Sequence, residues 1–140
     1  GGKVVKSTPP EIGILDITMS QSYKNDQLFG EFSQTIKALQ WHSYEVQNLE
    51  MNNNITLLGS SPTTKYQIFK YKEHAYGIQF HIEIKNNTVS MWACVPEYET
   101  ALEDSLGKGA LEKFDIVAQE NMKAMNFNAE NLYNNFKKIL

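Results

Sequence analysis

The chain has 140 residues, of which 41% are hydrophobic and 21% are charged, and its formal net charge at pH 7 is −3. This length suits one domain with a hydrophobic core, and the composition is that of an ordinary globular protein. The acidic balance excludes an electrostatic basis for binding nucleic acid or an anionic membrane. The single cysteine, Cys94, excludes an internal disulfide framework and favours a reducing compartment. Because no apolar run approaches membrane length and no signal-peptide pattern is present, we expect a cytoplasmic protein.

The first half of the chain predicts short strands that follow one another closely. Gly1-Gly2 before the β-branched pair Val4-Val5 is typical of a helix end that leads into a strand. This beginning fits either a tag remnant or a chain that starts inside a fold. Apolar runs predict strands over 12–19, 35–41, 55–59 and 65–71, with a turn at 7–10, where two prolines follow each other. Neighbouring strands joined by tight turns must run antiparallel.

The segment 75–84, Ala-Tyr-Gly-Ile-Gln-Phe-His-Ile-Glu-Ile, is the stretch with the clearest chemistry. Its apolar residues predict a buried strand, and residues two apart on a strand project to the same side. His81 and Glu83 are therefore expected side by side where the strand meets a loop. A carboxylate beside an imidazole fixes its tautomer, and such a pair forms the base and orienter of a nucleophilic triad. The alternative is a histidine that caps a strand while the glutamate lies in solvent.

The chain after residue 83 predicts helices. Short helices are expected over 88–92 and over 96–106, the second of them bounded by Pro96 and Gly107. Apolar residues then recur with helical spacing, and Asn128 is the expected N-cap of a separate last helix. By itself, the order of strands followed by helices would favour an α+β protein.

Four short segments carry a resemblance to a known family. In chain order they are Pro10-Glu11-Ile12-Gly13, Asp26-Gln27-Leu28-Phe29, Gln40-Trp41-His42-Ser43 and Gly77-Ile78-Gln79-Phe80-His81-Ile82-Glu83. They resemble the P-E-I-G, D-x-L-F, W-H-S and G-x-Q-F-H-P-E segments of class I, triad-type glutamine amidotransferases, closest to the GMP-synthetase-like branch. The resemblance extends from Gly1 to about Trp92, with one departure at Ile82, where the family usually has proline.

The resemblance implies an α/β fold, a three-layer sandwich of the flavodoxin-like type around a mainly parallel sheet. Residues 1–140 would form the C-terminal part of a single amidotransferase domain, with the first βα units outside the chain and an antiparallel extension within it. The family's nucleophile is a cysteine in a G-x-C-x-G elbow ahead of these motifs, and this sequence has no such elbow. Cys94 follows the histidine and lacks flanking glycines, so we expect a small buried hydrophobe or a bystander thiol.

The implied activity is hydrolysis of the glutamine side-chain amide to glutamate and ammonia through a Cys-His-Glu triad. His81 would be the base and Glu83 its orienter, with the cysteine outside this chain. Gln40 and His42 are the expected glutamine contacts, although the family's H-G-D aspartate is missing after His42, so a structural histidine fits equally well. The expected partners are glutamine and an ammonia-accepting synthetase domain or subunit. No cofactor, metal, nucleic acid or membrane is expected.

Two other functions stay open at this point. A γ-glutamyl peptidase or hydrolase would use the same triad on a different substrate. A non-catalytic amidotransferase-like module would keep His81 and Glu83 while binding a metabolite or a partner. An intact elbow ahead of Gly1 would favour the enzyme, and a substituted elbow would favour the binding module. Residues 1–140 alone are expected to be inactive, because they lack a nucleophile elbow.

Overall fold

A long antiparallel hairpin forms the frame of the fold. In the computed structural model, which describes residues 1–140, β1 (Lys3–Met19) pairs with β2 (Thr35–Gln47) along most of its length. The register shifts between Lys6 and Glu11, where two consecutive prolines have no N–H to give to the ladder. The prediction of a turn over residues 7–10 is therefore wrong. The backbone stays extended, and the prolines interrupt the pairing without ending the strand.

Three shorter strands complete the sheet: β3 (Ile55–Ser60), β4 (Ile68–Tyr71) and β5 (Ala75–Ile78). The order across the sheet is β2-β1-β3-β4-β5, and every neighbouring pair runs antiparallel, as the tight turns predict. Two short 3-10 helices, Gln21–Asn25 and Leu49–Met51, follow β1 and β2. The all-antiparallel pairing agrees with the antiparallel extension that the family resemblance places within residues 1–140.

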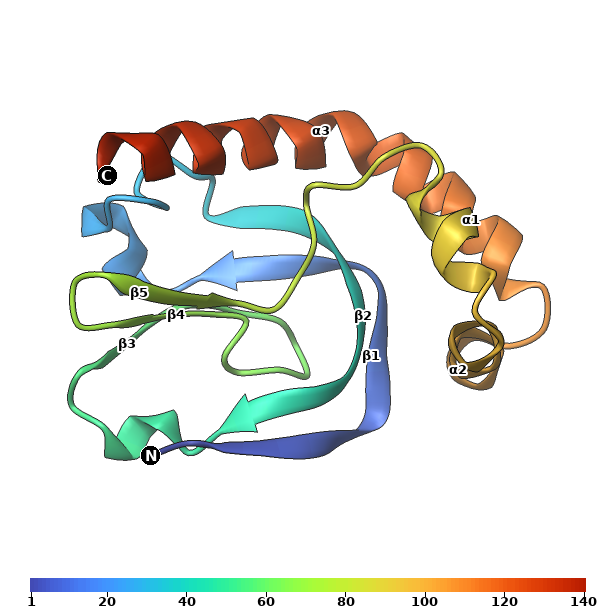
Figure 1. Cartoon of the computed structure of the whole chain (residues 1–140), viewed down its shortest axis with the longest axis horizontal. Helices are drawn as coiled ribbons and strands as arrows, with labels where there is room; N and C mark the ends of the chain where they lie inside the picture. Colours follow the sequence, from blue (N-terminus) through green and yellow to red (C-terminus); the bar gives the residue numbers. More distant parts are fainter.

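The sheet is strongly curved, because β1 and β2 bend together along their length (Figure 1). The predicted strand over 75–84 is shorter than expected, since β5 ends at Ile78. His81, further along, exchanges two backbone hydrogen bonds of 2.9 Å with Leu39 in β2. β5 and β2 are the two outer strands of the sheet, so His81 lies where the continuation of one meets the other.

Three helices follow the sheet: α1 (Thr88–Ala93), α2 (Pro96–Leu106) and α3 (Ala110–Lys138). The first two agree closely with the predicted helices, and Gly107 follows α2 with a φ of +88°, a backbone conformation that favours glycine. None of the helices combines the length and the apolar character that crossing a lipid bilayer requires.

The separate last helix predicted to start at Asn128 is wrong, because α3 runs unbroken through that residue. No proline or glycine occurs from residue 111 to residue 138. The residues that face the core also keep one helical period across the predicted break: Phe114, Ala118, Met122, Met125, Ala129 and Leu132. This continuous apolar stripe outweighs the local capping preference of asparagine.

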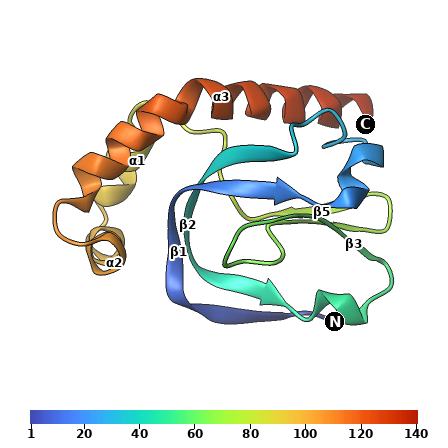
Figure 2. The same cartoon turned by 180° about the vertical axis from the view of Figure 1, so that it is seen from behind.

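α3 lies along one side of the curved sheet, and α1 and α2 gather near its N-terminal end (Figures 1 and 2). The side chains of Phe80, Ile82 and Ile84 belong to the same buried cluster as α3 and the two long strands. His81 and Glu83 alternate with them and are more exposed. The segment after β5 thus keeps its apolar side in the core and presents its polar side to solvent.

Candidate active site

His81 and Glu83 form a hydrogen-bonded acid–imidazole pair. Nδ1 of His81 lies 2.7 Å from Oε1 of Glu83, so the geometry predicted from their spacing is confirmed. The other carboxylate oxygen, Oε2, accepts a hydrogen bond of 3.0 Å from the backbone N–H of Ile82. The hydrogen bond from His81 lowers the pKa of Glu83, partial burial opposes this effect, and backbone N–H groups add to it. Glu83 is therefore ionised at neutral pH and holds the imidazole through Nδ1.

The imidazole of His81 is held from three directions. Its backbone pairs with Leu39, its Nδ1 bonds to Glu83, and its ring lies edge-to-face against Trp92 with the ring centroids 5.0 Å apart. Trp92 in turn packs against Trp41, with 5.6 Å between the centroids. Nε2 of His81 has no hydrogen-bond partner, and 36% of the side chain is exposed. Because Nδ1 donates to the carboxylate, Nε2 of the neutral ring has a free lone pair that can accept a proton.

A second acid–imidazole pair, Glu11 with His42, is buried and saturated with partners. Oε2 of Glu11 lies 3.0 Å from Nε2 of His42, and only 5% of Glu11 is exposed. The carboxylate also accepts hydrogen bonds from the side chains of Ser61, Thr63 and Gln67. Burial by itself raises the pKa of Glu11, but the hydrogen bonds from His42, Ser61 and Thr63 outweigh it and lower the pKa to about 2. This pair is suited to holding the fold together.

The two residues expected to contact glutamine lie in this buried network. Gln40 has 0% exposure, and its Oε1 lies 3.1 Å from Nε2 of His42. Nδ1 of His42 lies 3.0 Å from Nε2 of Gln79 and 3.0 Å from the carbonyl oxygen of Tyr44. Neither Gln40 nor His42 presents a free polar atom to solvent, so the arrangement gives no support to a direct contact with glutamine.

The sequence does not predict two of the residues near His81. Trp92 reaches the imidazole from α1, and Gln79 reaches His42 from the segment after β5. Gln79 belongs to the family-like segment that also contains His81, and this signal could have identified it. No sequence pattern identifies Trp92 as a neighbour of His81, because the two side chains meet only when α1 packs beside β2.

Cys94 lies directly after α1, where its Sγ donates a hydrogen bond of 3.2 Å to the carbonyl oxygen of Ser90. The side chain is exposed, so the expectation of a buried hydrophobe is wrong and the bystander thiol remains the expectation. No hydrogen bond joins Cys94 to His81. Nor does any group of three or more His, Cys, Asp or Glu side chains converge as ligands for a metal ion.

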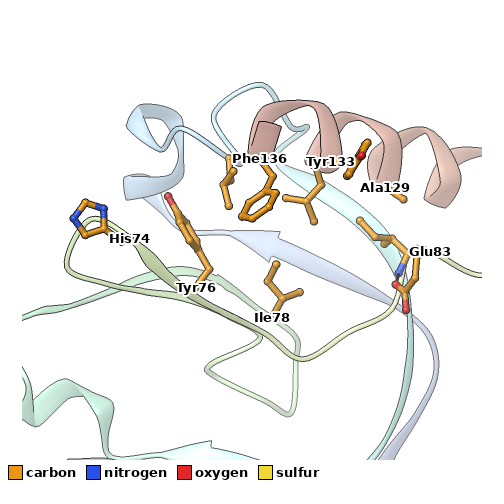
Figure 3. A pocket seen from close by; sticks show the side chains of 10 residues that line it. His74, Tyr76, Ile78, Glu83, Ala129, Tyr133 and Phe136 are labelled. Atoms are coloured by element: carbon orange, nitrogen blue, oxygen red, sulfur yellow. Dashed lines mark hydrogen bonds between the residues drawn. The ribbon is translucent and has the colours of Figure 1, made fainter. Parts of the chain in front are cut away.

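An apolar groove lies beside Glu83, between β5 and the C-terminal half of α3 (Figure 3). Its volume is about 480 Å³, and its walls are formed by Leu28, Tyr76, Ile78, Ile82, Ala129, Leu132, Tyr133 and Phe136, with His74 and Glu83 as the polar exceptions. Figure 3 shows His74 and Glu83 at opposite ends of the groove. Glutamine needs polar partners for its amide, carboxylate and ammonium groups, so the groove does not have the chemistry of a glutamine pocket.

Comparison with known proteins identifies the family. The family model described as Glutamine amidotransferase class-I matches residues 1–91, which include His81 and Glu83. The chain belongs to the class I glutamine amidotransferases. Over 87 residues, the chain is 30% identical to a glutamine-hydrolyzing GMP synthase subunit of Sulfurisphaera tokodaii, a match that covers 61% of the chain and 44% of the relative.

Solved structures show the same fold. A glutamine amidotransferase from Thermotoga maritima has a TM-score of 0.75 at 24% identity, and the match covers 95% of this chain and 54% of the Thermotoga chain. A putative GMP synthase subunit from Thermoplasma acidophilum has a TM-score of 0.53 at 32% identity, covering 61% of this chain and 41% of its own. The fold is thus the α/β fold of class I amidotransferases, and the chain spans about half the length of the relatives it matches.

Proposed function

We propose that this chain supplies the base and the orienting carboxylate of a Cys-His-Glu triad that hydrolyses glutamine. The observation that carries the proposal is the 2.7 Å hydrogen bond between Nδ1 of His81 and Oε1 of Glu83, which leaves Nε2 without a partner. The 30%-identical relative, whose name includes the words glutamine-hydrolyzing, supports the choice of substrate. The saturated pair of Glu11 and His42 offers no competing base.

The chemistry assigns each atom of the pair a role. A cysteine thiol gives its proton to Nε2 of His81, and the thiolate attacks the carbonyl carbon of the glutamine side-chain amide. The imidazolium then gives that proton to the amide nitrogen, the C–N bond breaks, and ammonia leaves a γ-glutamyl thioester. Water attacks the thioester while His81 accepts one of its protons, and glutamate and the thiol are released. Glu83 holds Nδ1–H throughout and stabilises the imidazolium.

The attacking cysteine, in this proposal, lies outside residues 1–140. Cys94 is a poor candidate, because its Sγ bonds to its own helix and no glycines flank it to form a strained elbow. Residues 1–140 would then form the C-terminal part of a single amidotransferase domain.

The ammonia would pass to a synthetase domain or subunit that consumes it. The relative from Sulfurisphaera tokodaii is named as one subunit of a GMP synthase, and this name supports a separate synthetase partner. The reaction as written needs no cofactor, and the proposed location is the cytoplasm.

The full-length gene product tests the proposal, with release of glutamate and ammonia from glutamine as the measurement. We expect turnover by the wild type and by Cys94→Ala, and none by residues 1–140 alone. An inactive but folded Cys94→Ala variant would contradict the placement of the nucleophile. Turnover of γ-glutamyl peptides in place of glutamine would identify a peptidase or hydrolase. Saturable binding of glutamine without turnover would identify a binding module.

A further inference from the structure

Gln79 lies where the segment after β5 changes its pairing partner. Its backbone N–H still donates to the carbonyl oxygen of Gln67, just before β4, at 3.0 Å. Two residues later, His81 pairs with Leu39 in β2 instead. Continuing that antiparallel register would place Gln79 opposite Trp41, yet no backbone hydrogen bond joins these two residues. The link between Gln79 and β2 is therefore made by its side chain.

The amide group of Gln79 donates to two atoms of β2. Its Nε2 lies 3.0 Å from Nδ1 of His42 and also donates to the carbonyl oxygen of Tyr44. The other nitrogen of His42, Nε2, faces two acceptors, Oε2 of Glu11 at 3.0 Å and Oε1 of Gln40 at 3.1 Å. In the neutral ring with its hydrogen on Nε2, Nδ1 accepts from the amide of Gln79 and makes no hydrogen bond to the carbonyl oxygen of Tyr44, which lies 3.0 Å away and accepts from the same amide. The donors thus run in one direction, from Gln79 through His42 to Glu11.

We propose that Gln79 is a positioning residue for His81, connected through His42 to the buried carboxylate of Glu11. This inference rests on the proposed function, because it concerns the placement of the proposed base. Two backbone hydrogen bonds join His81 to Leu39 in β2. The contacts of Gln79 with His42 and Tyr44 attach the segment after β5 to the same strand at further points. A general base must be held within a fraction of an ångström of its working position.

The hydrogen-bond network from Gln79 ends at the carboxylate of Glu11, which is itself held in place by several other hydrogen bonds. Only 5% of Glu11 is exposed, and three donors besides His42 bind its oxygens: Ser61, Thr63 and Gln67. Gln67 also supplies the carbonyl oxygen that accepts the backbone N–H of Gln79. The same buried group therefore ties together β1, β2, the β3–β4 connection and the segment that carries His81.

The test compares Gln79→Ala with Gln34→Ala in the full-length gene product. Gln34 is a matched control, because its Nε2 likewise donates to a backbone carbonyl, that of Met19, at 2.6 Å. We expect Gln79→Ala to lower kcat for glutamine by about 10- to 100-fold, with KM changed less than about twofold. Gln34→Ala should keep both constants. A folded Gln79→Ala variant with wild-type kcat would overturn the proposal.

A second variant acts at the other end of the contact. In His42→Gln, the new amide can still donate to Glu11, but it offers no acceptor where Nδ1 was. We expect a fall in kcat like that of Gln79→Ala, and the double variant should fall no further than either single variant. If Gln79→Ala fails to fold, His42→Gln decides the question alone, and unchanged kcat in that variant would overturn the proposal.

Long-range 1H–15N spectra of the imidazole rings in the same protein separate this inference from the proposed function, because they require no turnover. In the wild type, His81 should show one neutral tautomer with the hydrogen on Nδ1. In Gln79→Ala, Glu83 keeps the hydrogen on Nδ1, but the ring signals of His81 should shift and broaden as the ring samples more positions, while Gln34→Ala should match the wild type. Failure of the wild type to hydrolyse glutamine would remove the proposed function, and an unchanged His81 signal in Gln79→Ala would remove the positioning role.

Discussion

Two imidazoles in this chain each face a glutamate, and the two rings differ in their surroundings. His42 has partners on both ring nitrogens and lies beside Glu11, which is 5% exposed. His81 has a partner on Nδ1 only, and 36% of its side chain is exposed. A histidine can transfer protons to and from a substrate only where one nitrogen is accessible. The geometry therefore suits His81 to catalysis and His42 to structure.

Replacing Glu83 with glutamine should lower kcat by about 100-fold or more, because the amide neither fixes hydrogen on Nδ1 nor stabilises the imidazolium. The thermal midpoint should change little, since 65% of the Glu83 side chain is exposed. Steady-state kinetics of glutamine hydrolysis measure the effect. Glu45→Gln is the matched control, because Glu45 is a partly exposed glutamate that also bonds to the side chain two residues on, Gln47. Wild-type kcat in Glu83→Gln would contradict the assignment.

Glu11 should make folding stability depend on pH in acid. Its folded pKa of about 2 lies below the ordinary value of 4.5, so its stabilising contribution is complete above the ordinary value and is lost as the pH falls toward 2. The contribution of the ionised carboxylate at neutral pH is about 3 kcal/mol.

Urea unfolding of the wild type and of Glu11→Gln at two pH values measures this dependence. The difference between them in the free energy of unfolding should shrink by about 2 kcal/mol from pH 7 to pH 3, because at pH 3 Glu11 is almost fully protonated in the unfolded chain but mostly ionised in the folded one. A difference that is the same at both pH values would show that Glu11 does not have a depressed pKa.

At the scale of elements, those with local boundary signals could be predicted from the sequence. α2 begins at Pro96 and ends before Gly107, because each of these residues acts within its own turn. The early end of β5 could not be predicted, because it depends on the pairing of His81 with Leu39, which are far apart in the chain. The sequence also does not predict that α3 continues through Asn128. Asparagine favours the N-cap of a new helix, but the packing of the continuous apolar stripe outweighs this preference.

A proline at position 129 distinguishes one continuous helix from two. If Asn128 capped a separate helix, position 129 would be its first residue, where proline is well tolerated. In the continuous α3, Ala129→Pro removes a backbone hydrogen bond and clashes with the preceding turn, so we expect a loss of about 3 kcal/mol or more in the free energy of unfolding. Ala129→Gly should cost only about 1 kcal/mol. Denaturant titration of both variants checks this, and equal costs would contradict a continuous helix.

At the scale of the whole molecule, the site divides into a part that sequence spacing predicts and a part that it does not. His81 and Glu83 meet because residues two apart share a side in any extended segment, whatever surrounds it. Glu11 and His42 meet because they are directly paired across β1 and β2, and Gln79 reaches them because the sheet curves until its outer strands approach each other. No local pattern in the sequence predicts that curvature. The prediction that His42 contacts glutamine rests only on its position in a family-like segment.

The measurement that tests the central claim most directly is ammonia release from glutamine by His81→Ala in the full-length gene product. Removing the imidazole takes away the only acceptor for the thiol proton, so we predict a loss of about 1,000-fold or more in kcat with the far-ultraviolet circular dichroism unchanged. His74→Ala is the matched control, because His74 is an exposed histidine in the β4–β5 turn, and it should retain the wild-type rate. A folded His81→Ala variant that releases ammonia at the wild-type rate would contradict the account.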